Sequence, residues 1–288
     1  KSITARNAHV QTEVKIIQKI KRHRIKRNTS KLLESTGENY AKLFNKKAAL
    51  SSVSARVIWN GQEYCVYDSE MPDKTYIFRH EKQGHLSYKR GLKSRAVKLG
   101  EDYFLEQIEF EKGDTVLDCG ANLGDLLLWF SLKNLDINYV GFEPSPVEHA
   151  CATRNVAPHP VHNVGLWNKD DLVEFYLSSQ GADSSFIEPA LYDDKITIQT
   201  RRLYSFVGKP VRLLKLEAEG AEPEILEGVG DRLANIEYIS ADLGFERGKT
   251  AESTLVPVVN YLLSNEFELI DVAHKRICAL FKNKAYTG

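Results

Sequence analysis

The chain contains 288 residues, and its 39 lysines and arginines balance its 39 aspartates and glutamates, so the formal net charge is zero. This balance gives no indication of a polyanionic partner, and we expect no nucleic acid to bind. No apolar run approaches the roughly 20 residues that cross a bilayer, so we expect no transmembrane segment. At roughly 100–200 residues per domain, the length suits two domains, or one domain with an extension.

The use of cysteine indicates the cellular compartment. The four cysteines lie far apart in the sequence and include no C-x-x-C pair: Cys65, Cys119, Cys151 and Cys278. Such spacing is typical of reduced thiols rather than of a disulfide framework. The first residues contain no apolar run typical of a signal peptide. We therefore expect a cytoplasmic protein.

A strongly basic segment, KIIQKIKRHRIKR, occupies residues 15–27 and contains no acidic residue. Its isoleucines partly fit one face of a helix. One interpretation is a solvated helix that packs on its own domain or on a second subunit. In the second case the protein would be a homo-oligomer. The other interpretation is attraction to an anionic surface, membrane or polymer. We favour the first, because only the composition supports the second.

The residues that follow predict a small α+β unit. Two β-branched and aromatic runs flank Asn60-Gly61, a dipeptide that favours the type I′ turn of a β-hairpin. The run TYIFRH predicts a third strand. Residues 87–110 predict helix in two pieces, with the break near Gly100. We expect this unit to cap the domain that follows it.

From Asp114 onward, short apolar runs alternate with helical stretches. This β-α-β-α-β order predicts an α/β domain with a parallel sheet that helices cover. We therefore divide the chain into an N-terminal helical segment with an α+β cap, 1–100, and a larger domain, 101–288. The last two runs, FELIDVAHK and RICALFKN, are close enough to pair antiparallel at the end of the sheet. The earlier expected strands are TVLDCG, INYVGFEP, VHNVGLW, LVEFYL, KITIQTRRL, VRLLKLEAEG and IEYISADLG.

The first of these strands runs into the turn Asp118-x-Gly120-x-Asn122-x-Gly124, and the second ends at Glu143. Ligands of open α/β sheets bind outside the carboxyl ends of the strands. Glycine allows a backbone conformation and a close ligand approach that a Cβ would block, and asparagine enters the left-handed region readily. An acid after the second strand is suited to accept the two hydroxyls of a ribose. The pattern therefore predicts a site for a nucleotide-like molecule.

Two cofactor classes fit such a layout. A nicotinamide dehydrogenase would show G-x-G-x-x-G at the start of its helix, and the glycines here do not have that spacing. An acid placed before the first glycine resembles instead the turn by which methyltransferases bind S-adenosylmethionine.

Three segments read together make the resemblance specific: DTVLDCGANLG, YVGFEPSP and LLKLEAEGAEPEILEG. From about Tyr88 to the C-terminus, the sequence resembles the FkbM family of S-adenosylmethionine-dependent methyltransferases. Glu217 stands where many members have Asp. The resemblance implies the class I methyltransferase fold, a Rossmann-like seven-stranded sheet whose last strand is antiparallel. It also implies S-adenosylmethionine as the cofactor, held by the turn and by Glu143, with Asn163 near the adenine.

Three further acids are candidate catalytic residues. Glu217 and Glu219 are two apart on an expected strand, so we predict that they point to the same side, and Asp242 ends another strand. One of them could accept a proton from the methyl acceptor. No spacing of His or Cys supports a metal site. Ser184 and Ser185, in a polar loop, could close over the substrate.

The resemblance implies O-methylation, commonly of a sugar or polyketide-type hydroxyl, so the expected partner is a small-molecule or glycan acceptor. Some relatives methylate nitrogen on peptide side chains, which is the alternative substrate class. A non-catalytic binding module on the same fold is a further alternative, because fold alone does not fix function.

Overall fold

The computed structural model describes residue 29 and residues 31–178, 184–273 and 276–287. The basic segment at residues 15–27 lies outside the described residues. Within the described part of the chain, no helix is long and apolar enough to cross a membrane.

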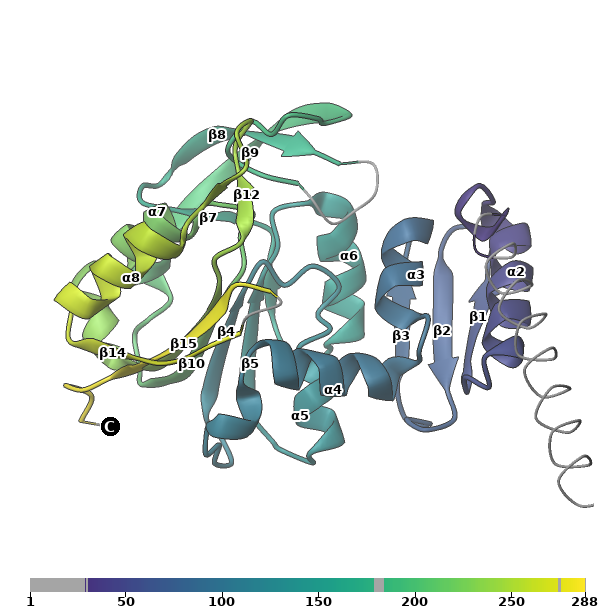
Figure 1. The fold of residues 1–288 in the computed structure, drawn as a ribbon, viewed down its shortest axis with the longest axis horizontal. Coiled ribbons are helices and arrows are strands. Elements are labelled where there is room, and N and C mark those ends of the chain that lie inside the picture. The colour runs from purple at the N-terminus through teal and green to yellow at the C-terminus, as the bar shows by residue number, and fades with distance from the viewer. Residues whose placement is uncertain (1–28, 30, 179–183, 274–275, 288) are drawn as a thin grey trace, which may run out of the picture.

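A seven-stranded sheet forms the centre of the larger domain, with the order β14-β15-β11-β10-β4-β5-β6 (Figure 1). The strand β15 lies between β14 and β11 and is antiparallel to both. The five strands β11, β10, β4, β5 and β6 are parallel to one another. The predicted class I methyltransferase sheet with an antiparallel last strand is therefore confirmed. In chain order its strands are β4 (Thr115–Cys119), β5 (Asn138–Phe142), β6 (Val161–His162), β10 (Val211–Leu216), β11 (Ile236–Asp242), β14 (Phe267–Val272) and β15 (Cys278–Asn283).

Both faces of the central strands β4, β10 and β11 are buried, which explains why these strands are mainly apolar runs. Leu213 packs on one face with α4 and α5, and its neighbour Leu214 packs on the other face with α7 and α8. The alternation follows from the two-residue period of a strand. The helices are α2 (Gly37–Leu50), α3 (Glu81–Tyr88), α4 (Leu92–Asp102), α5 (Leu127–Leu132), α6 (Pro146–Asn155), α7 (Glu222–Val229) and α8 (Leu255–Ser264).

The expected strand VHNVGLW divides into two strands of different sheets. Its first part is β6, at the edge of the large sheet, and its second part is β7 (Gly165–Trp167). The strand β7 pairs with β9 (Asp194–Arg202), which forms a hairpin with β8 (Asp171–Leu177). This second sheet lies beside the carboxyl ends of β4 and β5 (Figure 1). A further short pair is formed by β12 (Phe245–Arg247) and β13 (Glu252–Ser253).

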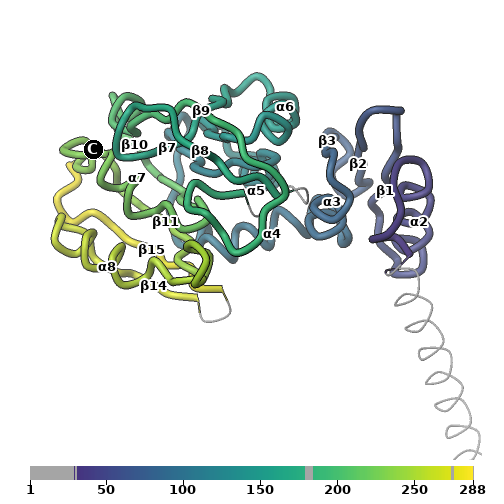
Figure 2. Tube along the Cα trace, turned by 90° about the horizontal axis from the view of Figure 1, so that it is seen from above, coloured from purple at the N-terminus to yellow at the C-terminus, as the bar shows by residue number. Residues whose placement is uncertain are grey.

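The N-terminal part forms a separate three-stranded antiparallel sheet of β1 (Ala55–Trp59), β2 (Tyr64–Asp68) and β3 (Thr75–Phe78), covered by α2. Figure 2 shows this part at one end of the molecule, away from α8 and β14. Its core is aromatic: the ring centroids of Tyr64 and Phe78 are 5.0 Å apart. Such ring pairs stabilise by about 0.5–1.5 kcal/mol beyond the area that they bury.

The predicted hairpin at Asn60-Gly61 is present, but its turn is not type I′. The loop contains four residues, because Trp59 pairs with Tyr64. Gly61 has a φ of +100°, whereas Asn60 keeps a negative φ and accepts the backbone N–H groups of Gln62 and Glu63 through its side-chain oxygen. The asparagine therefore acts through its side chain, as in an Asx turn.

The predicted break near Gly100 is wrong, because the two helices separate at Gly91, which has a φ of +94°. Gly100 lies inside α4, where a Cβ would be 2.3 Å from the indole nitrogen of Trp129, so this glycine allows close packing on α5. The expected boundary after residue 100 consequently falls within α4. The hydrophobic core of the N-terminal part also includes Leu123 and Leu128 of the larger domain.

Candidate active site

A cavity of about 1280 Å³ opens at the carboxyl ends of β4, β5 and β10. Its walls come from several places in the sequence. The glycine turn after β4 and the corner after β5 form one side, and the loop after β10 forms the next. Helices α3 and α4 also line the cavity, as do Phe175 of β8 and Phe186 of the segment between β8 and β9.

The glycine turn is very tightly packed. Gly120 has a φ of +73°, and a Cβ there would lie 1.8 Å from the carbonyl oxygen of Glu217. Gly124 has a φ of +77°, and a Cβ there would lie 2.3 Å from the Val156 side chain. Asn122 between them has a φ of +50°. Gly120 and Asn122 line the cavity, whereas Gly124 is not among its lining residues.

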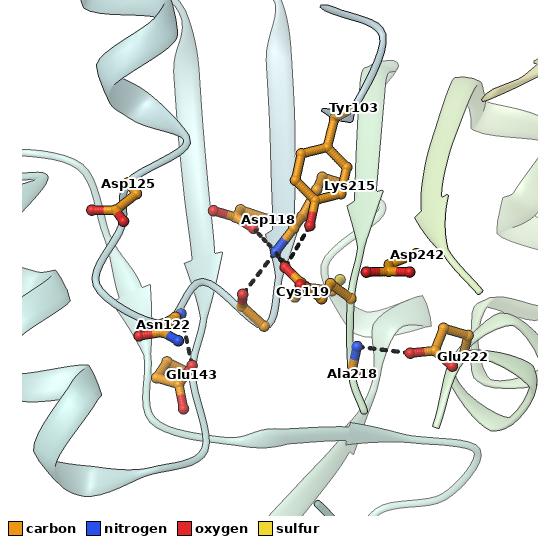
Figure 3. Close-up of polar contacts among 12 residues, drawn as sticks. Tyr103, Asp118, Cys119, Asn122, Asp125, Glu143, Lys215, Ala218, Glu222 and Asp242 are labelled. Carbon is orange, nitrogen blue, oxygen red and sulfur yellow. Dashed lines mark hydrogen bonds and ion pairs between the residues drawn. The ribbon is translucent and has the colours of Figure 1, made fainter. Parts of the chain in front are cut away.

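Glu143 lies beside this turn with its carboxylate buried (Figure 3). One oxygen accepts the backbone N–H of Asn122 at 2.7 Å, and the other accepts that of Ser145 at 2.8 Å. Burial raises the pKa of Glu143 to about 8. A carboxylate offers about four lone-pair directions, so each oxygen can accept one more donor from a ligand in the cavity.

Asp118, at the end of β4, is 1% exposed and faces a lysine that the sequence reasoning did not select. The ammonium of Lys215 lies 3.0 Å from one Asp118 oxygen and 2.8 Å from the carbonyl oxygen of Gly120, to which it donates (Figure 3). The other Asp118 oxygen accepts the hydroxyl of Tyr139 at 2.7 Å. Lys215 is itself only 4% exposed. Lys215 precedes the two acids of the motif KLEAEG. Its position at the end of β10, next to these acids, is the feature of the sequence that could have identified it.

Glu217 is the acceptor of a second polar cluster. The hydroxyl of Tyr103 donates to it at 2.5 Å, Lys215 lies 3.2 Å away, and Arg276 forms an ion pair with it. The same Arg276 also forms an ion pair with Asp242. Asp242 is buried and is not among the residues that line the cavity.

We expected Glu217 and Glu219 to lie on a strand and therefore to point to the same side, but the two residues do not lie on a strand. The strand β10 ends at Leu216, and Glu219 has a φ of +50°, so the period of a strand does not apply to these residues. Both nevertheless line the cavity. Glu222 shapes their loop, because its buried carboxylate accepts the backbone N–H of Ala218 at 2.8 Å.

The remaining candidate site residues are Asn163, Ser184 and Ser185. The side-chain amide of Asn163 donates to the carbonyl oxygens of Glu143 and Pro144, and Asn163 does not line the cavity. The hydroxyl of Ser185 donates to the carbonyl oxygen of Glu219, whereas Ser184 lines the cavity.

The N-terminal part contacts the glycine turn directly, which the sequence reasoning missed. Gln83 of α3 donates to the side-chain oxygen of Asn122 at 2.5 Å. The carboxylate of Asp125, one residue beyond the turn, accepts the Tyr88 hydroxyl at 2.6 Å and the Arg95 guanidinium at 2.8 Å. No periodicity in the sequence connects residues so far apart.

No group of three or more His, Cys, Asp or Glu side chains suited to hold a metal ion occurs among the described residues. The site instead presents carboxylates around a tight backbone turn at the strand ends. Together with the sheet order, this arrangement defines the class I methyltransferase fold.

Residues 118–286 match the model of the methyltransferase FkbM domain, and because this match covers more than half of the chain, the chain belongs to that family. The expected family resemblance is thereby confirmed. The chain is 26% identical to "Methyltransferase 1" of Beauveria bassiana over 151 residues, which are 42% of this chain and 61% of the relative. It is 36% identical to the 31-O-demethyl-FK506 methyltransferase FkbM of Streptomyces tacrolimicus over 59 residues, which are 20% of this chain and 23% of the relative. The chain thus spans less than two thirds of either curated relative.

Two solved methyltransferase structures match part of the chain at low identity. The methyltransferase FkbM of Methylobacillus flagellatus KT has a TM-score of 0.46 and 15% identity, over 70% of this chain and 53% of its own. TrmK of M. capricolum, in complex with S-adenosyl-homocysteine, has a TM-score of 0.36 and 9% identity, over 66% of this chain and 70% of its own.

Proposed function

We propose that this chain is a methyltransferase that uses S-adenosylmethionine and acts on a hydroxyl of a sugar or polyketide-type acceptor. Membership of the FkbM methyltransferase family supports the reaction class. The observation that carries the cofactor assignment is the buried Glu143 carboxylate, which lines the cavity beside the glycine turn and accepts one backbone N–H on each oxygen. The name of the Streptomyces relative, a methyltransferase of 31-O-demethyl-FK506, supports an oxygen acceptor.

The residues of the site suit the cofactor as follows. Glu143 would accept two ribose hydroxyls, and the backbone of Gly120 and Asn122 would lie along the methionine part. When bound, S-adenosylmethionine supplies an activated methyl group. The protein would contribute mainly position and the exclusion of water, which in favourable cases lower a barrier by roughly 7–11 kcal/mol.

We propose Glu219 as the group that accepts the acceptor's proton. Glu219 lines the cavity with a left-handed backbone conformation, which is costly for a side chain other than glycine or asparagine. Glu217 is held by Tyr103, Lys215 and Arg276, and Asp242 by Arg276 and the N–H of Gly244. These contacts favour a positioning role for both over a catalytic one.

We further propose that residues 1–100 act as a cap over the acceptor side and that residues 101–288 bind the cofactor. The cavity walls support a cap, because α3 and α4 line the cavity together with the glycine turn.

Two measurements test the proposed function. Calorimetry should show that S-adenosylhomocysteine binds to the wild-type protein, and that Glu143→Ala weakens binding by roughly 1.5–3 kcal/mol for each ribose hydrogen bond that it removes. A screen of sugars, polyketides and peptides with labelled S-adenosylmethionine should then give a methylated hydroxyl. Unchanged affinity in Glu143→Ala would remove the cofactor assignment. Label on a peptide nitrogen would replace the proposed acceptor class, and binding without turnover on any acceptor would favour a non-catalytic module.

A further inference from the structure

The connection between α3 and α4 places two cations on the exposed rim of the cavity. Lys89 and Arg90 follow the last residue of α3, Tyr88, and both side chains are exposed and line the cavity. Among the described residues, neither side chain forms an ion pair or a hydrogen bond. The other two cations of this wall are already paired, Arg95 with Asp125 and Lys98 with Asp102.

This connection is held in one conformation by a buried acid. Asp68, at the end of β2, accepts the backbone N–H of Leu92 at 2.7 Å and so satisfies one free donor at the start of α4. A Cβ on Gly91 would lie 2.5 Å from the same carboxylate, so this position requires glycine. Lys89 and Arg90 therefore project from a fixed backbone, which reduces the ordering cost of binding a ligand.

Between Gln83 and Leu99, the residues that line the cavity include four cations and no acid. Burial, together with the charges of Lys47 and Lys89, lowers the pKa of His85 to about 4. The nearest cavity-lining acid on the helix that follows is Glu101, nine residues beyond Leu92, or about 13 Å along the axis. The other acids that line the cavity, among them Glu143, Glu217 and Glu219, belong to the larger domain.

We propose that Lys89 and Arg90 form an anion-binding subsite for an acidic group of the methyl acceptor. That group is a carboxylate, a sulfate or a phosphate monoester, since the planar fork of arginine and the ammonium of lysine both match such oxyanions. The hydroxyls of Ser87 and Ser94, which line the same wall, are further donors within the cavity. The acceptor would then place its acidic group against the cap and its reacting hydroxyl toward Glu219. This inference rests on the proposed function, whose substrate class it narrows to anionic acceptors.

Titration with inorganic pyrophosphate at about 0.15 M ionic strength tests the subsite without knowledge of the acceptor. Calorimetry compares the wild-type protein with Lys89→Ala/Arg90→Ala, in the presence and absence of S-adenosylhomocysteine. Removal of two charge-assisted hydrogen bonds should weaken pyrophosphate binding about tenfold or more. The matched control is Lys93→Ala/Lys112→Ala, which removes two cations that pair with Glu70 and Asp136 and do not line the cavity. The control should bind pyrophosphate within about twofold of the wild type, because both of its cations are already paired with acids and neither lines the cavity.

Equal affinity in the cavity variant and the wild type, or no binding of pyrophosphate to the wild type, would overturn the subsite. A parallel titration with glucose 6-phosphate, glucose and a short RNA oligonucleotide identifies the kind of ligand. Tighter binding of glucose 6-phosphate than of glucose, abolished in the cavity variant, is the expected result. Preferential binding of the RNA, weakened equally in the control variant, would contradict a small anionic acceptor. The titration of S-adenosylhomocysteine is separate, so failure of the cofactor assignment and failure of the subsite give different results.

Discussion

The ammonium nitrogen of Lys215 lies 3.0 Å from a carboxylate oxygen of Asp118, and both side chains are almost fully buried beneath the glycine turn. The same ammonium donates to the carbonyl oxygens of Cys119 and Gly120. A buried charge is tolerated only where it is paired and hydrogen-bonded, and Lys215 meets both conditions. The pair therefore fixes the end of β4 against the end of β10, where the cavity begins.

Replacement of Lys215 by Met should destabilise the protein strongly. It leaves the buried Asp118 without its counter-charge, and breaking such a pair from one side costs about 3–5 kcal/mol. The free energy of unfolding, measured with urea, checks this. Lys42→Met is the control, because Lys42 pairs with Glu38 on the surface of α2 and its removal should cost at most about 0.5 kcal/mol. A destabilisation below about 1 kcal/mol at Lys215 would contradict a structural role for the pair.

Gly120→Ala should disturb the turn far more than Gly113→Ala. Both glycines have positive φ, +73° and +86°, so both substitutions incur a backbone cost of about 1–2 kcal/mol. Only at Gly120 does the new methyl also clash, with the backbone of Glu217, whereas nothing lies within 4 Å at Gly113. Urea unfolding and titration of S-adenosylhomocysteine measure the two consequences. Equal effects of the two substitutions would show that the close approach at Gly120 is relieved without cost.

The stability of the protein without cofactor should depend on pH through Glu143. Burial raises its pKa to about 8 in the folded protein, from about 4.5 in the unfolded chain. The folded state therefore binds more protons across this window, and the contribution of Glu143 to stability is complete below about pH 4.5 and is lost as the pH rises through about 8. Between pH 4.5 and 8.5, the midpoint temperature of thermal unfolding should fall more steeply for the wild type than for Glu143→Gln. Parallel curves for the two proteins would contradict a protonated Glu143.

Binding of the cofactor should release a proton from Glu143 near pH 7. Without ligand this carboxyl is mostly protonated at that pH, because its pKa is about 8, and hydroxyl donors from a ribose favour its charged form. Calorimetric titrations of S-adenosylhomocysteine in two buffers of different ionisation enthalpy give the number of protons released. The expected value approaches one for the wild type and zero for Glu143→Gln. Proton uptake by the wild type would exclude the proposed contact.

Glu219→Gln should separate catalysis from cofactor binding. The substitution retains size and hydrogen bonding but removes the base, and loss of a general base typically lowers the rate about 10²–10⁴-fold. The affinity for S-adenosylhomocysteine should change little. Asp242→Asn is the comparison, because Asp242 contacts Arg276 and does not line the cavity, so its effect should appear in stability. If turnover survives in Glu219→Gln, the proton leaves to water and position alone drives the transfer.

The sequence predicted the sheet and the conformation of the glycine turn well because both depend on local patterns. Buried strands appear as apolar runs, and the residues of the turn are constrained by φ at Gly120, Asn122 and Gly124. The antiparallel insertion of β15 followed from the family resemblance and from the short spacing of the last two strands. These features require little knowledge of residues that are distant in the sequence.

The sequence could not give the partners that tertiary structure brings together. Lys215 sits in the buried strand β10, and only the fold shows that it reaches Asp118 and the carbonyl oxygens of the turn. Glu217 and Glu219 were expected on a strand, but β10 ends at Leu216 and Glu219 has a positive φ, and single-residue conformations of this kind leave no periodic signal. Arg276 was not selected because nothing near it in the chain indicates an acid partner.

The contacts between the cap and the glycine turn limit how this protein can change over evolution. Gln83 holds Asn122, Tyr88 and Arg95 hold Asp125, and the hydroxyl of Tyr76 donates to the carbonyl oxygen of Gly124. A cap acquired by recombination from another protein would lack these four side chains. It would leave the Asp125 carboxylate, beside the glycine turn, without its hydrogen-bond donors and its counter-charge. New acceptor preferences in this lineage should therefore arise by substitution within the existing cap, around the fixed positions 76, 83, 88 and 95, rather than by exchange of the whole unit.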